Sequence, residues 1–304
     1  MAVLTDKRLV VVSGKGGVGK STVAAALAVA SARMGLRTLV CEVNTRERIT
    51  ALLGRPEVGA NLALLEENLW AVDIRPVEAM REYALMILKF ESVYNAVFEN
   101  RLVRYFLRFI PSLQELVMLG KILFHLREQR PDGTFRFDRV VVDAPATGHA
   151  ITFLSVPQVI LDTVPPGSLA TEAAKMRDVL VDREVTAAVL VSLPEEMPVN
   201  ETLELSAALA QRVSLATQAV VLNGFNSRRF SEADLAALEP APELFHAAKA
   251  HSERAQMSAV ACERLGSSLG LTPVCVPRLF HASFGPRAVD EVARLLAPLF
   301  EGPA

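Results

Sequence analysis

Short hydrophobic runs recur along the chain, and each leads into a segment whose apolar residues repeat at helical spacing. The runs contain few alternating polar positions, which is typical of strands covered on both faces of a parallel sheet. About seven runs interleaved with helices predict a doubly wound, mostly parallel α/β fold. The runs span residues 8–14, 37–43, 68–74, 137–144, 186–193, 218–225 and 272–279.

The segment from Arg75 to Arg130 interrupts this alternation, because helical patterns follow one another there without a strand between them. We therefore expect a single domain over residues 1–304 with a helical insertion at residues 75–130. Inside the insertion, Arg101, Arg104 and Arg108 fall on one helical face, opposite an apolar face. This helix either packs on its own domain with a solvated basic face, or meets an apolar client.

The net charge and the hydropathy of the chain limit the classes of partner that it is expected to bind. The 32 Lys and Arg residues are balanced by 34 Asp and Glu residues, which gives a net charge of -2 and no broad basic field. Nucleic-acid binding is therefore not expected. No stretch reaches the length of a membrane span, and the amphipathic segment at residues 289–300 carries only Arg294 as a base. We expect a cytoplasmic protein without stable membrane insertion.

The three cysteines, Cys41, Cys262 and Cys275, are widely separated and form no CxxC pair. This spacing favours neither a disulfide framework nor a zinc clip. A soft metal or metalloid site would need all three thiolates gathered by folding. We expect small buried apolar residues instead.

The most specific feature is the run GKGGVGKST at residues 14–22, between a predicted strand and a predicted helix. Its glycines let successive backbone N–H groups close around phosphate oxygens, and the following helix points its positive end at the anion. In such a loop Lys20 contacts the β and γ phosphates, Ser21 ligates Mg²⁺, and Thr22 lies near the α phosphate. The expected nucleotide-binding residues of the loop are Gly14, Gly16, Gly17, Val18, Gly19, Lys20, Ser21 and Thr22.

A dinucleotide-binding loop is the rival interpretation. Gly14, Gly16 and Gly19 also satisfy GxGxxG, and Glu42 ends the next predicted strand where a ribose-binding acid would stand. That type of loop needs neither Lys20 followed by a hydroxyl nor the acidic strand end at Asp143. We therefore expect ATP with Mg²⁺, held by Ser21 and, through water, by Asp143.

Asp143 opens the run Asp143-Ala144-Pro145-Ala146-Thr147-Gly148-His149. With Lys15 in the phosphate loop, this run resembles the ATPase family of arsenite pumps and tail-anchored-protein targeting factors. A lysine directly after the first glycine is shared more widely, for example with ATPases of the MinD and ParA type. The DxPxTGH run is narrower, and in the family it is the second switch segment, which senses the γ phosphate.

The resemblance covers nearly the whole chain and implies a dimer in which two phosphate loops face each other. Lys15 would reach across to the partner's nucleotide and add charge stabilisation. The partner would be a second copy or a related subunit. The helical insertion would face the client, and Pro111 to Glu115 resembles a recurrent PGxDE stretch.

Other positions match the family residue by residue. Asn223 matches a position whose amide reads the adenine edge, and Pro277 and Arg278 follow the last predicted strand, where the base also packs. Glu201 resembles a position near the partner's nucleotide, although ordinary N-terminal helix chemistry also explains it. His149 is expected as a conformational sensor, or as a hydrogen-bonded structural histidine.

The chain departs from the family where an aspartate positions the attacking water. Asn44 stands there, and an amide can orient water but cannot accept its proton. Glu42 lies two residues earlier on the same strand face and is a candidate substitute. Hydrolysis is therefore expected to be slow. The chain also has a single phosphate loop and no zinc-binding CxxC, so neither arsenite transport nor tail-anchor insertion follows.

Three hypotheses remain open. The first is a dimeric ATPase that closes on ATP and passes the motion to a protein or small-molecule client. The second is an ATP-binding regulatory subunit with weak hydrolysis in a hetero-oligomer. The third is a membrane-cycling switch of the MinD type, which would use the C-terminal amphipathic segment.

Overall fold

The computed structural model describes residues 3–43, 48–88 and 112–300, with the side chains of residues 83–88 left out. Asn44, Pro111 and the predicted basic face of Arg101, Arg104 and Arg108 lie outside the described residues.

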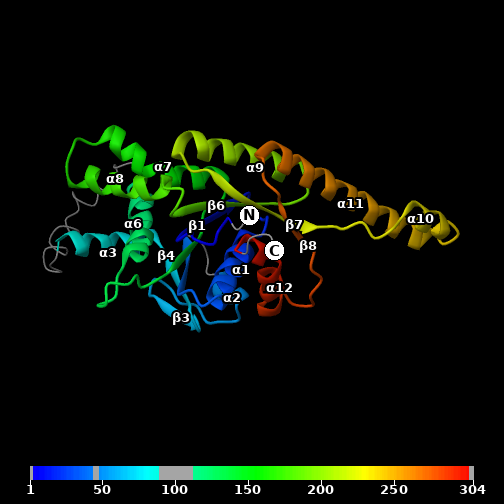
Figure 1. Ribbon diagram of the computed structural model, residues 1–304, viewed down its shortest axis with the longest axis horizontal. Helices are drawn as coiled ribbons and strands as arrows, with labels where there is room; N and C mark the ends of the chain where they lie inside the picture. Colours follow the sequence, from blue (N-terminus) through cyan, green and yellow to red (C-terminus); the bar gives the residue numbers. More distant parts are fainter. Residues whose placement is uncertain (1–2, 44–47, 89–111, 301–304) are drawn as a thin grey trace.

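Within the described residues, eight strands form one sheet in the order β3-β4-β2-β5-β1-β6-β7-β8 (Figure 1). All neighbouring pairs are parallel except β3 with β4. The doubly wound α/β class predicted from the hydrophobic runs is confirmed. The strands are β1 (Leu9–Gly14), β2 (Thr38–Val43), β3 (Ala63–Glu66), β4 (Leu69–Ile74), β5 (Arg139–Asp143), β6 (Thr186–Ser192), β7 (Thr217–Phe225) and β8 (Val274–Pro277).

The extra strand β3 was not predicted. It is four residues long, pairs antiparallel at the edge of the sheet and leaves Leu64 62% exposed. An edge strand of this length lacks the buried apolar run by which the other strands are recognised.

Helices cover both faces of the sheet, and alternate residues of each central strand face the two layers. On β1, Leu9 and Val11 pack on one side while Val10 and Val12 pack on the other. The first side carries α6 (Leu113–Arg127), α7 (Thr147–Thr163), α8 (Ser168–Val181) and α9 (Glu196–Ala208). The second side carries α1 (Lys20–Arg33), the short α2 (Ile49–Leu52) and α12 (Pro286–Leu296).

Within the predicted insertion at residues 75–130, the structure describes two helices, α3 (Pro76–Leu88) and α6. The insertion itself stays a prediction. Helix α6 packs against the sheet, with Leu116, Leu119, Ile122 and Leu123 buried. This end of the segment therefore belongs to the core of the main domain.

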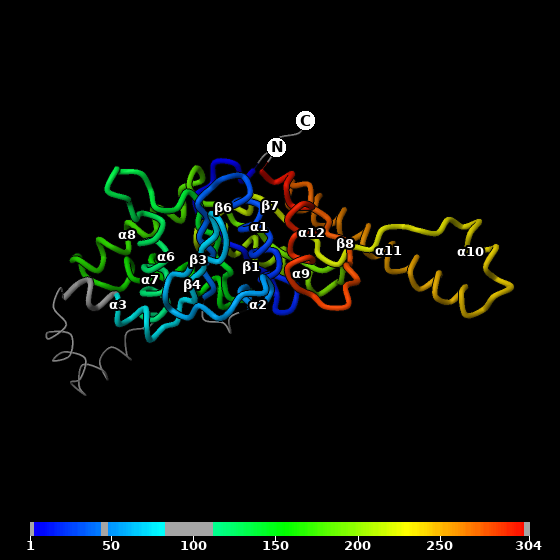
Figure 2. Tube along the Cα trace, turned by 90° about the horizontal axis from the view of Figure 1, so that it is seen from below, coloured from blue at the N-terminus to red at the C-terminus, as the bar shows by residue number. Residues whose placement is uncertain are grey.

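Two helices extend away from the sheet in a direction that the sequence patterns did not indicate. Helix α11 (Pro242–Leu269) leaves the body beside α9, and α10 (Glu232–Leu238) folds back along its far end (Figures 1 and 2). None of the residues of α10 is buried. We call α10 and the first half of α11 the arm.

The amphipathic C-terminal segment forms α12, which packs its apolar face onto α1. Val289, Val292, Ala293 and Leu296 are all buried there. In the part of the chain that the structure describes, no helix combines the length and the apolar character needed to cross a membrane.

The cysteines differ in their surroundings. Cys41 is buried on β2, and burial raises the pKa of its thiol to about 12. Cys262 on α11 and Cys275 on β8 bring their Sγ atoms to 3.5 Å, which the sequence spacing did not suggest. Among the described residues, no group of three or more His, Cys, Asp or Glu side chains could hold a metal ion.

Candidate functional site

The phosphate loop connects the carboxyl end of β1 to the first turn of α1, as predicted. Two of its glycines cannot be replaced without displacing a neighbour. A Cβ at Gly14 would lie 2.3 Å from the carbonyl oxygen of Val191, and one at Gly19 would lie 2.4 Å from Nδ2 of Asn223. Gly19 also has φ +96°, a conformation that other residues rarely adopt. The loop is thus closely fitted to the strand ends around it.

Lys20 begins α1 and its Nζ donates to the backbone oxygen of Lys15 at 3.0 Å, across the loop. Burial lowers the pKa of Lys20, partly offset by the nearby charge of Asp143. Among the described residues the ammonium group of Lys20 bonds only to a carbonyl of its own loop, so it is well placed to take an anionic partner instead.

Ser21 and Asp143 meet at the carboxyl ends of β1 and β5. The Ser21 hydroxyl donates to Oδ2 of Asp143 at 2.6 Å. Asp143 is 2% exposed, and its other oxygen, Oδ1, has no hydrogen-bond partner in the described structure. Burial raises the pKa of Asp143, against the opposing effects of the Ser21 hydroxyl and Lys20. A buried carboxylate oxygen without a partner, beside a hydroxyl, fits a site for Mg²⁺ and its water.

Glu42 lies in register between Asp143 on β5 and Asp73 on β4, so three carboxylates stand in a row across the sheet. It is 3% exposed, and burial raises its pKa to about 7. Its Oε1 accepts the backbone N–H of Arg48 at 2.8 Å. Glu42 therefore holds the backbone of Arg48, directly before α2, at the end of β2.

Lys15 is paired within its own chain. Its Nζ donates to Oε1 of Glu201 on α9 at 2.6 Å, and both side chains are a little over a quarter exposed. The structure thus brings Glu201 to the phosphate loop, which the sequence left open.

The residues predicted to hold the base lie together at the ends of β7 and β8. Nδ2 of Asn223 donates to the carbonyl oxygen of Val18 at 2.9 Å, which ties β7 to the phosphate loop. Pro277 pairs with Phe225, whose carbonyl accepts the N–H of Arg278 at 3.0 Å. The Arg278 guanidinium lies over the ring of Phe280.

His149 stands in the first turn of α7, where its side chain is exposed. The preceding segment is held closer to the loop, because the hydroxyl of Ser13 donates to the carbonyl oxygen of Pro145 at 3.1 Å. Through this hydrogen bond, a movement of the Asp143–His149 segment would also move the end of β1.

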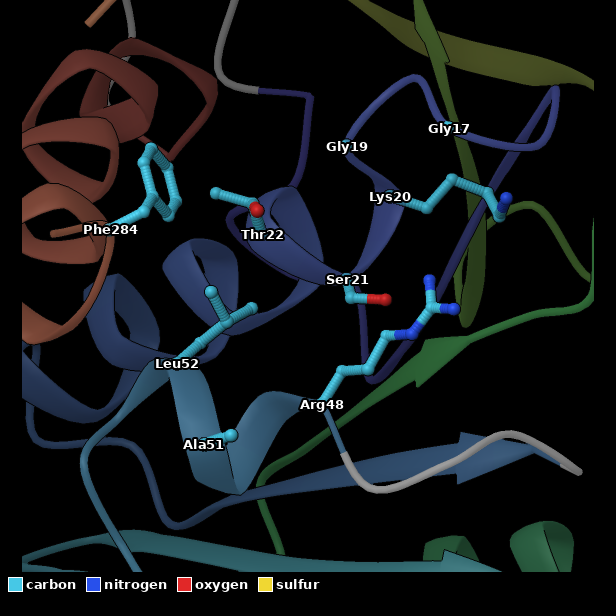
Figure 3. A pocket seen from close by; sticks show the side chains of 9 residues that line it. All are labelled: Gly17, Gly19, Lys20, Ser21, Thr22, Arg48, Ala51, Leu52 and Phe284. Atoms are coloured by element: carbon cyan, nitrogen blue, oxygen red, sulfur yellow. The ribbon is translucent and has the colours of Figure 1, made fainter. Parts of the chain in front are cut away.

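A cavity of about 420 Å³ opens beside the loop (Figure 3). Four of its lining residues were not predicted from the sequence, because no motif marks them and they come from α2, its flank and the segment before α12. The lining residues are Gly17, Gly19, Lys20, Ser21, Thr22, Arg48, Ala51, Leu52 and Phe284.

The sequence was compared with known proteins. The model of the family described as anion-transporting ATPase matches residues 7–165, just over half of the chain. The chain belongs to this family. The match includes the phosphate loop, Glu42 and the Asp143–His149 segment, while Asn223, Pro277 and Arg278 lie beyond it.

Individual relatives agree with this family assignment. ATPase BagA of Mycobacterium tuberculosis is 33% identical over 227 residues, which cover 72% of this chain and 66% of that protein. ATPase GET3B of Arabidopsis thaliana is 25% identical over 268 residues, covering 72% of this chain and 64% of that protein. A Halobacterium salinarum protein named as an arsenical pump-driving ATPase is 26% identical over 234 residues, covering 72% of this chain and 35% of that protein. The chain thus spans just under two thirds of the first two relatives and about a third of the last.

Proposed function

We propose that this protein is a Mg-dependent ATPase that works as a two-subunit switch. The observation that carries the proposal is the convergence of a glycine-rich loop, Lys20 and the Ser21–Asp143 pair at the carboxyl ends of the central strands. Phosphoryl transfer depends mainly on positioning and charge, and these groups supply both.

In this proposal each side chain has a definite task. Lys20 leaves the carbonyl of Lys15 and donates to the β and γ phosphates of ATP. Ser21 and, through water, Asp143 hold Mg²⁺, which when bound neutralises charge on the β and γ phosphates. Asn44 or Glu42 orients the attacking water. The carboxylate of Glu42 is half ionised near neutral pH, because burial raises its pKa to about 7.

The two-subunit form rests on Lys15. To reach the nucleotide of a second copy or a related subunit, Lys15 must exchange its ion pair with Glu201 for the partner's phosphates. ATP would favour this exchange and ADP would not, so hydrolysis would reopen the pair. The helical insertion at residues 75–130 would pass the change to a protein or small-molecule client.

A second candidate function is an ATP-binding regulatory subunit with weak hydrolysis. Two observations favour it: Asn44 cannot accept a proton, and the Glu42 carboxylate is engaged by the backbone N–H of Arg48.

Steady-state release of phosphate from Mg-ATP tests these proposals together. We expect the wild type to turn over Mg-ATP and Lys20→Ala to keep less than about 1% of the wild-type turnover. The specific activity of the wild type should rise with protein concentration, and that of Lys15→Ala should not. Asn44→Asp should raise turnover sharply if the regulatory function is correct. Equal turnover in the wild type and Lys20→Ala would overturn the ATPase proposal.

A further inference from the structure

Arg48 is the one residue of the cavity lining, apart from Lys20, that carries a positive charge. It stands directly before α2, and its guanidinium extends into the cavity toward Ser21 and the side chain of Lys20 (Figure 3). The arginine is exposed, and in the described part of the chain its guanidinium makes no hydrogen bond or ion pair. Its N–H donors are therefore available to a ligand.

The backbone of Arg48 is held firmly even though its side chain is open. Its N–H donates to Oε1 of Glu42 at 2.8 Å, and Glu42 is buried at the carboxyl end of β2. Because Glu42 is in register with Asp143, Arg48 is anchored beside the strand that carries the Ser21–Asp143 pair. The sheet thus holds the backbone of Arg48 beside the cavity.

The electrostatics of the cavity match a polyanion. Burial lowers the pKa of Lys20, and the charge of Arg48 lowers it further. The same charge opposes the rise that burial causes in the pKa of Asp143, so the guanidinium is close enough to act on both groups. Two cations that point into one cavity repel each other until an anion comes between them. A chain of phosphates would remove this repulsion and use the donors of both residues.

The place of Arg48 in the cavity indicates which phosphate it meets. Thr22 and Phe284 lie at the opposite side of the cavity from the ends of the Lys20 and Arg48 side chains (Figure 3). In a loop of this kind the hydroxyl after Ser21 marks the α phosphate, whereas the lysine and the metal mark the β and γ phosphates. Arg48 is therefore on the terminal-phosphate side.

We propose that Arg48 is a phosphate-binding residue that contacts the γ phosphate from within the same subunit and makes the site prefer ATP to ADP. This inference rests on the proposed function and adds a specificity determinant to it. The planar fork of arginine can give two parallel hydrogen bonds to one phosphate, which a lysine cannot do. The same charge would stabilise the phosphoryl group during transfer.

The test is equilibrium binding of Mg-ADP and of Mg²⁺ with the non-hydrolysable ATP analogue AMP-PNP, measured by titration calorimetry. We expect Arg48→Gln to raise the Kd of AMP-PNP at least about tenfold and that of ADP less than about threefold, since a hydrogen bond to a charged group is lost only with the triphosphate. Arg48→Lys should fall between the wild type and Arg48→Gln. Thermal unfolding of each variant reports whether the fold is kept, which is expected because the side chain is exposed.

Arg55→Gln is the matched control, because Arg55 is also exposed, follows α2 and lies outside the cavity lining. It should leave the Kd of both nucleotides unchanged. Equal losses for ADP and AMP-PNP in Arg48→Gln, or no loss for either, would overturn the role of Arg48. If the wild type binds neither nucleotide, the proposed function itself fails, so the two failures are distinguishable.

Discussion

Single residues set the shape of the phosphate loop and the ionisation of the groups around it. Gly19 needs a positive φ and leaves no room for a Cβ, because the Asn223 amide that holds the loop is in the way. Glu42 is ordered by the N–H of Arg48 but is buried beside two other carboxylates. The crowded backbone at Gly19 and the burial of Glu42 therefore both bear on the proposed nucleotide site.

Gly19→Ala should destabilise the fold and weaken nucleotide binding. The left-handed φ costs about 1 kcal/mol for alanine, and the new methyl group also displaces Asn223 from Val18. Gly35→Ala is the control, because Gly35 has φ +82° but nothing within 4 Å of the added Cβ. Chemical denaturation should show a larger loss of unfolding free energy for Gly19→Ala, and equal losses would contradict the crowding at Asn223.

Glu42 should make stability depend on pH. Its pKa is raised from 4.5 to about 7 in the folded protein, so the folded state binds the proton more tightly than the unfolded state. This stabilisation is complete below about pH 4.5 and is lost as pH rises through about 7. The unfolding free energy of the wild type relative to Glu42→Gln should fall by up to about 3 kcal/mol between pH 5 and pH 8. Glu66→Gln, at an exposed site on β3, is the control, and a pH-independent difference for Glu42→Gln would be evidence against this.

The loop residues could be predicted from the sequence because each one is marked by a motif whose chemistry is local. Arg48 and Phe284 could not, because they line the cavity from the flank of α2 and the segment before α12, and no motif marks either residue. Asn223 was predicted to read the base, and its contact with Val18 depends on two strands separated by most of the chain. Its role toward the base stays a prediction.

At the scale of elements, β5 has a residue of the candidate site at its carboxyl end and a buried arginine at its amino end. Asp143 at its carboxyl end meets Ser21, while Arg139 at its start is 1% exposed and binds three separate segments. Its guanidinium donates to the backbone oxygens of Leu4, Thr5 and Lys7 and to the Ser31 hydroxyl on α1. It also lies 4.8 Å from the centre of the Phe300 ring.

Arg139→Met should be among the most damaging substitutions for stability. It removes four hydrogen bonds from one buried guanidinium, although the Leu4 oxygen keeps the N–H of Lys7 as a donor. The loss of such a network costs about 3–5 kcal/mol. Arg37→Met removes a more exposed ion pair with Asp138 and should cost about 1 kcal/mol or less. Thermal and chemical unfolding measure both, and a loss for Arg139→Met no larger than for Arg37→Met would show that the network adds little.

Elements with a long buried run were predictable, and the others were not. The parallel strands follow from hydrophobicity alone, whereas β3 is too short and exposed and the arm of α10 and α11 has too few buried residues to signal its direction. The contact of Cys262 with Cys275 likewise depends on how α11 crosses β8.

At the scale of the whole molecule, the parallel sheet brings the ends of β1, β2, β5, β7 and β8 to one edge, where the loop, the carboxylates and Asn223 meet. This arrangement explains why residues spread over more than two hundred positions form one site. The arm and helix α3 lie at opposite ends of the same body (Figure 1).

Titration calorimetry of Mg-ATP into the wild type and Lys20→Ala tests most directly whether ATP binds at this end of the sheet. We predict one site per chain in the wild type, with at least about tenfold weaker binding in Lys20→Ala because a buried charge-assisted contact to phosphate is lost. Omission of Mg²⁺ should weaken wild-type binding as well. Binding of equal strength in the two proteins, or no binding by the wild type, would contradict the assignment of the Gly14–Thr22 loop as an ATP site.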